Sequence, residues 1–195
     1  MKHSRGLTLI ESIVAIGIFT IIMSAIVGSV IFFYRANTSS LEQAYQIDSA
    51  RRGVEFLVRD LREATFGDNG AYPVATIAST SITFFSDTDK DAAIERIHYS
   101  LEGTNLYRHT LDSSGTPPTY SGSGATSTVS TYVRNGEEVV PIFRYYDSSG
   151  TEITDYVQVD EVRSVVIDLV VNIQPVRKPE EFTLRGSATL RNLRN

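Results

Sequence analysis

The chain opens with a stretch in which almost every position is apolar or small. Residues 7–33 contain one charged side chain, Glu11. A helix of this length would extend about 40 Å at about 1.5 Å per residue, more than a hydrocarbon core of about 30 Å. Lys2 and Arg5 precede it, so the positive-inside tendency keeps residues 1–6 in the cytoplasm and places the rest of the chain outside. The pattern predicts a single-pass helix in the cytoplasmic (inner) membrane.

The following stretch is amphipathic. Apolar residues recur with the spacing of one helical face at Val54, Leu57, Val58 and Leu61. Leu41 and Tyr45 extend this face less regularly, and charged residues, among them Asp60, mostly occupy the other faces. No proline interrupts residues 37–64, and stop signals in FGDNGAYP place the end around residues 66–70. We therefore predict one helix over residues 7–64.

Beyond residue 70 the hydrophobic pattern changes to short runs with a period of two. It predicts strands over residues 81–85, 94–100, 106–110, 139–146, 164–174 and 182–190. Gly103 supplies the turn between the second and third, and Pro141 makes the fourth an edge or irregular strand. Residues 112–131, rich in Ser, Thr and Gly, predict an exposed loop that is either mobile or a contact loop for a partner.

Together these elements predict an α+β fold. Its long N-terminal helix has a transmembrane half and an amphipathic half, and it packs on a C-terminal antiparallel sheet. The expected segments are a basic leader at 1–6, the membrane helix at 7–33, its amphipathic continuation at 34–65, and a β-rich domain at 66–195.

Composition narrows the classes of function. The chain has no cysteine, which excludes disulfides, thiol catalysis and Cys-based metal sites. Lys and Arg number 18 against 23 Asp and Glu, a net charge of -5, which argues against a generally basic nucleic-acid binder. His98 and His109 fall in predicted strands and read as ordinary strand residues. No serine elbow, phosphate loop or zinc-protease signature occurs, so no catalytic residues and no enzyme activity are predicted.

Glu11 needs an explanation, because a carboxylate at the centre of a lipid-embedded helix costs about 2.5–3.5 kcal/mol. Either Glu11 reaches the cytoplasmic interface and interacts with the positive end of the helix dipole, or it has a cationic partner. Its context is informative. A short basic tail ends at Gly6, and Leu-Thr-Leu-Ile-Glu follows at the start of the apolar helix.

This block resembles the prepilin signal of the type IV pilin-like family, which includes pilins and the pseudopilins of type II secretion and DNA-uptake systems. The resemblance implies that prepilin peptidase cuts between Gly6 and Leu7 and methylates the new amine of Leu7. It also implies that Glu11 meets the terminal amine of a neighbouring subunit during filament assembly. The family most often has Phe where Leu7 stands.

The segment VEFLVRDLREA, which begins at Val54, is similar to the corresponding segment of large minor pilins and of the J-type minor pseudopilin. The resemblance implies a non-catalytic minor subunit, in a filament tip or initiation complex, that reaches an envelope or cell-surface filament. Its expected partners are prepilin peptidase, other pilins or pseudopilins through the N-terminal helix, and the inner-membrane assembly platform. Nucleic acid is not expected. The alternative is a membrane-anchored binding or hydrolytic domain with an uncleaved signal anchor.

One acidic segment suggests a metal. Asp87, Asp89 and Asp91 alternate along SDTDKDAAIER, and Glu95 follows four residues later. Calcium is bound by several hard oxygens presented at this alternation from a tight loop. The EF-hand pattern would also have Gly and Glu where Ala92 and His98 stand. Calcium binding and a solvated acidic turn both remain open, and no other cofactor is predicted.

Overall fold

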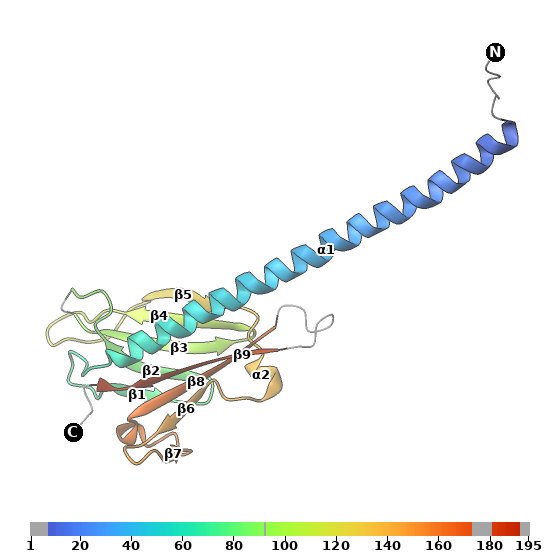
Figure 1. Cartoon of the computed structure of the whole chain (residues 1–195). Helices are drawn as coiled ribbons and strands as arrows, with labels where there is room; N and C mark the ends of the chain where they lie inside the picture. The colour runs from blue at the N-terminus through green and yellow to red at the C-terminus, as the bar shows by residue number, and fades with distance from the viewer. Residues whose placement is uncertain (1–7, 92, 173–180, 192–195) are drawn as a thin grey trace. The chain divides into compact units, whose positions relative to one another are not determined.

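The computed structural model describes residues 8–91, 93–172 and 181–191 (Figure 1). The chain divides into two compact units, Met1–Ala44 and Tyr45–Asn195. The long helix α1, Leu9–Arg62, contributes to both. A long N-terminal helix and an antiparallel β domain confirm the predicted α+β class.

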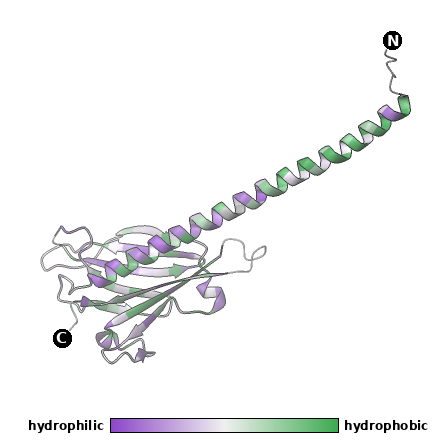
Figure 2. Cartoon of the chain, in the orientation of Figure 1, coloured by the Kyte–Doolittle hydropathy of each residue, from purple (hydrophilic) through white to green (hydrophobic). Residues whose placement is uncertain are grey.

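In the first unit, α1 has no charged side chain between Glu11 and Arg35. All its large hydrophobic side chains between Leu9, which is 79% exposed, and Tyr34, which is 76% exposed, are exposed. Figure 2 shows hydrophobic colouring along this half of α1, with polar residues becoming frequent in the other half. The best 18-residue window has a mean hydropathy of 2.5 and none of it is buried, which is sufficient in length and composition to cross a membrane. The Thr20 hydroxyl donates to the Ile16 carbonyl at 2.9 Å, so this polar group is paired within the helix itself.

The helix ends at Arg62 because the chain there joins a β-sheet. Ala64 forms an isolated bridge with Ser86, and the Thr65 amide donates to the Phe85 carbonyl at 2.9 Å. The predicted helix extended to residue 64, with stop signals at 66–70, so the observed end at Arg62 comes two residues before the predicted end. Sheet pairing of Ala64 and Thr65, which no turn residue announces, ended the helix first.

The first sheet has five antiparallel strands in the order β1-β2-β3-β4-β5. They are β1 Val74–Ile77, β2 Ser81–Ser86, β3 Glu95–Glu102, β4 Asn105–Leu111 and β5 Ala125–Ser130. Gly103 has a φ of 59° in the tight turn between β3 and β4, a conformation that favours glycine. Three of these strands, β2, β3 and β4, correspond to predicted ones.

The second sheet has four antiparallel strands in the order β7-β6-β8-β9. They are β6 Phe143–Tyr146, β7 Glu152–Ile153, β8 Ser164–Val171 and β9 Phe182–Thr189. A short helix α2, Asn135–Glu138, precedes β6, and a 3-10 turn η1, Val159–Glu161, precedes β8. The two sheets are tied at one side, where the Tyr145 hydroxyl donates to the Ala78 carbonyl at 2.8 Å.

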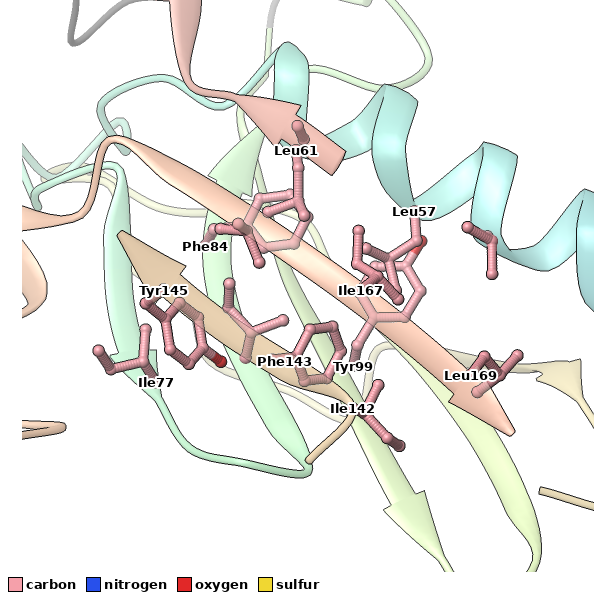
Figure 3. Packing of buried hydrophobic residues seen from close by; sticks show 14 of the residues in the cluster. Leu57, Leu61, Ile77, Phe84, Tyr99, Ile142, Phe143, Tyr145, Ile167 and Leu169 are labelled. Carbon is pink, nitrogen blue, oxygen red and sulfur yellow. The ribbon is translucent and has the colours of Figure 1, made fainter. Parts of the chain in front are cut away.

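The core lies among α1 and both sheets. Leu57 and Leu61 are 0% exposed and point from α1 toward Phe84, Tyr99 and Ile167 (Figure 3). The helix approaches one edge strand of each sheet closely. A Cβ added at Gly53 would lie 2.8 Å from the Val129 Cγ1 of β5. On the opposite side, a Cβ added at Gly186 of β9 would lie 2.6 Å from the Val54 Cγ1.

Several sequence expectations were wrong in detail. Residues 125–130 form β5 inside the segment predicted as a loop, because Thr and Val suit an edge strand, and its last two residues, Val129 and Ser130, are the ones that pack inward. The strand predicted from residue 139 begins at Phe143, since Pro141 has no amide to donate and Val139 has a positive φ of 56°. Leu41 and Tyr45 are exposed, at 51% and 72%, so the buried face of α1 starts later than predicted.

Candidate functional site

The first turn of α1 is a reciprocal hydrogen-bonded cap. The Glu11 carboxylate accepts from the Thr8 amide and from the Thr8 hydroxyl, each at 2.8 Å. The Thr8 hydroxyl oxygen lies 3.4 Å from the Glu11 amide that donates to it. This is the capping-box arrangement, in which a Thr and the Glu three residues later satisfy free amides at a helix start.

The cap gives Glu11 a partner in its own chain. The sequence analysis weighed the helix dipole and a cation from another chain, and it missed this third source of stabilisation. The signal was present, because Thr-Leu-Ile-Glu fits the pattern Ser/Thr-x-x-Glu before an apolar run. Gly6 and Leu7, the residues of the expected cleavage site, lie outside the described residues.

A second candidate is the loop between β2 and β3, where four acidic side chains converge. One carboxylate oxygen from each of Asp87, Asp89, Asp91 and Glu95 lies within 4.8 Å of the others. Glu95 is 2% exposed and accepts from the Thr88 amide at 2.7 Å. Burial, together with the charges of Asp89 and Asp87, raises the pKa of Glu95.

The donor chemistry of this acidic loop fits a hard divalent cation. Four carboxylates offer oxygen ligands, which calcium prefers, and a bound cation would offset their mutual repulsion. Ser86 is also fully buried beside the loop, is paired in register with Glu95, and its hydroxyl has no hydrogen-bond partner among the described residues. Hydrogen bonds within the loop already occupy part of the carboxylates, since the Lys90 amide donates to Asp87 at 2.7 Å. Both readings of the sequence therefore retain support.

A buried polar network joins α1 to the first sheet. Asp60 is 1% exposed, and its Oδ2 accepts from the Tyr99 hydroxyl and from the Arg108 guanidinium, each at 2.8 Å. Burial raises the pKa of Tyr99 well above its usual value, and although burial alone would lower the pKa of Arg108, the Asp60 charge raises it. The sequence analysis placed Asp60 among the charged residues outside the apolar stripe and did not predict that its side chain is buried. Its partners come from β3 and β4, far along the chain, and helical spacing cannot reveal them.

A similar network holds the second sheet. Asp168 of β8 is 3% exposed and forms ion pairs with Arg144 of β6 and Arg185 of β9. Burial alone would raise the pKa of Asp168, but the two arginines hold it below its usual value. The Asn135 side chain donates to the Asp168 carbonyl and accepts from the Val170 amide, both at 2.8 Å. These contacts fix strand positions and are structural.

The structure therefore describes an apolar helix that begins at a Thr-Glu cap and leads into an antiparallel β domain. Residues 1–27 match the family model described as the prokaryotic N-terminal methylation motif. The match supports a prepilin-type signal, like that of type IV pilins, at the N-terminus of this chain. No curated protein matches the chain.

Proposed function

We propose that this chain is a minor pilin or pseudopilin, a non-catalytic subunit of a type IV pilus or type II secretion pseudopilus. One observation carries the proposal: a methylation motif at residues 1–27 begins the same apolar helix that continues into an antiparallel β domain. A signal anchor that only tethers a domain needs about 20 apolar residues. Here α1 extends over 54 residues, and its C-terminal part belongs to the folded core.

In this proposal the protein acts by polymerisation. Prepilin peptidase cuts after Gly6 and methylates Leu7, and the apolar part of α1 then packs among the helices of neighbouring subunits. The inner-membrane assembly platform extracts the subunit into an envelope filament. Placement in the tip or initiation complex rests on the resemblance of the segment that begins at Val54 to large minor subunits.

The test is processing in a cell that carries a matched prepilin peptidase. We expect Gly6→Ala to leave a single, larger, uncleaved species, measured by immunoblot and by mass spectrometry of the N-terminus. Gly17→Ala is the matched control, because a Cβ at Gly17 would meet nothing within 4 Å. It should be cleaved and methylated like the wild type.

The same experiment separates the two functions considered. If Gly6→Ala is processed normally, or if the wild-type chain keeps Met1, the chain is a tethered extracytoplasmic domain and the filament proposal fails.

A second property is favoured by the acidic loop. We propose that Asp87, Asp89, Asp91 and Glu95 bind calcium, because their oxygens converge within 4.8 Å and include a buried carboxylate. The ion would stabilise the connection between β2 and β3 and would have a structural role.

A further inference from the structure

The outer edge of β9 is an open strand edge. Among the described residues, β9 pairs with β8 alone, at the end of the sheet. Alternate residues of an antiparallel strand direct both backbone groups to the same side. The Leu190 amide donates to the Arg163 carbonyl on the β8 side, so Thr183, Arg185, Ser187 and Thr189 direct theirs outward. Consistent with this phase, the Ser187 carbonyl accepts from Arg62 of α1 at 3.4 Å.

A basic groove runs beside this open edge. It lies between β9 and α1 and has a volume of about 800 Å³. Val54, Val58 and Leu184 supply its apolar lining. Its charged lining consists of Arg51, Arg59, Arg62, Arg185 and Arg191, with Glu55 and Glu63.

The arginines outnumber the acids in a chain whose net charge is -5. Within the described residues, neither Arg51 nor Arg191 forms an ion pair with an acidic side chain. An extended acidic segment with aliphatic side chains would complement this groove in charge, in backbone hydrogen bonding and in polarity.

The opposite edge of the same sheet carries an acidic segment, whose extended part is β7, Glu152–Ile153, and which turns at Tyr156 and Val157. β7 is the other terminal strand, and residues 151–161, which contain it, include no Lys or Arg. Glu152, Asp155, Asp160 and Glu161 are all exposed there. Val157 is 82% exposed and Tyr156 is 41% exposed, so apolar side chains accompany the acids.

We propose that the β9 edge and its arginine groove bind the acidic β7 edge, residues 151–157, of a second copy of this chain. The pairing joins two different edges of one sheet, so it is heterologous and leaves a free β9 edge and a free β7 edge at the two ends of every open assembly. Arginines at one edge and carboxylates at the other set the direction of addition and disfavour pairing of two like edges.

The experiment uses intermolecular cross-linking of the full chain in native membranes. The protein has no cysteine, so the introduced thiols are the only ones in this chain. Ser187→Cys and Thr154→Cys, both at exposed positions, are placed in separate, co-expressed copies. Paired strands lie about 4.8 Å apart, within disulfide reach, so mild oxidation should give a cross-linked dimer on non-reducing gels. Ser127→Cys on β5, the edge strand of the other sheet, replaces Ser187→Cys in the control and should give none.

Charge substitutions test the chemistry. Arg62→Glu should abolish the cross-link, and adding Glu152→Arg on the partner copy should restore it. Unfolding temperatures near that of the wild type will show that these surface variants fold. The proposal is overturned if the Ser187/Thr154 pair gives no more dimer than the control, or if Arg62→Glu leaves the dimer unchanged. It also fails if the protein binds duplex DNA through these arginines in a gel mobility-shift assay while no dimer forms. The assay does not require processing, so Gly6→Ala copies should cross-link equally well.

Discussion

At the residue scale, Glu11 shows how a carboxylate can stand at the start of an apolar helix. Its oxygen accepts two hydrogen bonds from Thr8, so the charge is stabilised within one turn of its own chain. That local role does not exclude a second partner, because a carboxylate has about four acceptor sites. Local capping and pairing between subunits predict different behaviour for two substitutions.

We expect Glu11→Gln and Glu11→Ala both to be processed but to enter filaments several-fold less than the wild type. Gln keeps an acceptor for Thr8 and removes the charge, whereas Ala removes both. Incorporation is measured by immunoblot of sheared filaments against the membrane fraction. Thr8→Ala is the control, since it removes the capping hydroxyl and leaves the charge, and it should assemble close to wild type. Normal assembly of Glu11→Gln would show that the carboxylate acts as a cap and not as an ionic partner.

At the scale of elements, the packing of α1 depends on two glycines, Gly53 on the helix and Gly186 on β9. A Cβ on Gly186 would lie 2.6 Å from Val54 Cγ1 and 2.9 Å from Val58 Cγ2, which is closer than packed atoms allow. Gly53 has the same relation to Val129 on the other side. The helix therefore lies close to β9 at Gly186 and close to β5 at Gly53.

Gly186→Ala should destabilise the domain by about 1–3 kcal/mol, because it overpacks this contact. For a chain of this size the loss lowers the unfolding temperature by several degrees, measured by circular dichroism of the full chain in detergent. Val54→Ala in the same chain should recover part of the loss by making room. Ser187→Ala, at an exposed position next to Gly186, should change stability by less than about 0.5 kcal/mol. Equal stability of Gly186→Ala and wild type would contradict the close approach.

The elements also show what the sequence can reveal. The helix and the strands β2, β3, β4, β8 and β9 follow from local sequence, because their apolar residues form continuous runs or recur with a regular spacing. The sequence analysis missed β1, β5, β7 and α2, which are short or depend on pairing with distant segments. The buried Asp60 belongs to the same class, since its hydrogen-bond partners lie 39 and 48 residues away. The Thr8–Glu11 cap was within reach, because its signal is local.

At the scale of the whole molecule, calcium is expected to stabilise the full chain. Saturation of a site that exists only in the folded state adds about 2.7 kcal/mol at one hundred times the dissociation constant. Because burial and the neighbouring carboxylates raise the pKa of Glu95 in the folded state, its ionised form opposes folding. Without calcium, the contribution of Glu95 to stability is therefore lost as the pH rises through its folded-state pKa. Calcium should remove that penalty at neutral pH.

The measurement is the unfolding temperature in about 1 mM calcium and in chelator, at neutral pH and near the ordinary carboxyl pKa of about 4.3. The calcium-dependent increase should be several degrees at neutral pH and should fade at acid pH, as protonated carboxyls cease to be ligands. Asp91→Asn should reduce the increase, and magnesium should not reproduce it. If calcium leaves the unfolding temperature unchanged at neutral pH, the loop is a solvated turn that does not bind calcium.

The cap at the start of α1 affects the stability of the Glu11 charge in a subunit that is not yet assembled. Because the Thr8 amide and hydroxyl both donate to Glu11, its carboxylate is hydrogen-bonded in the membrane even before the subunit meets another one. Recruitment into the proposed filament then adds a cationic donor to a carboxylate that is already hydrogen-bonded and does not rescue an isolated ion. The free energy gained at Glu11 on assembly is therefore smaller than for a carboxylate without a partner, and this favours reversible exchange of subunits between the filament and the bilayer.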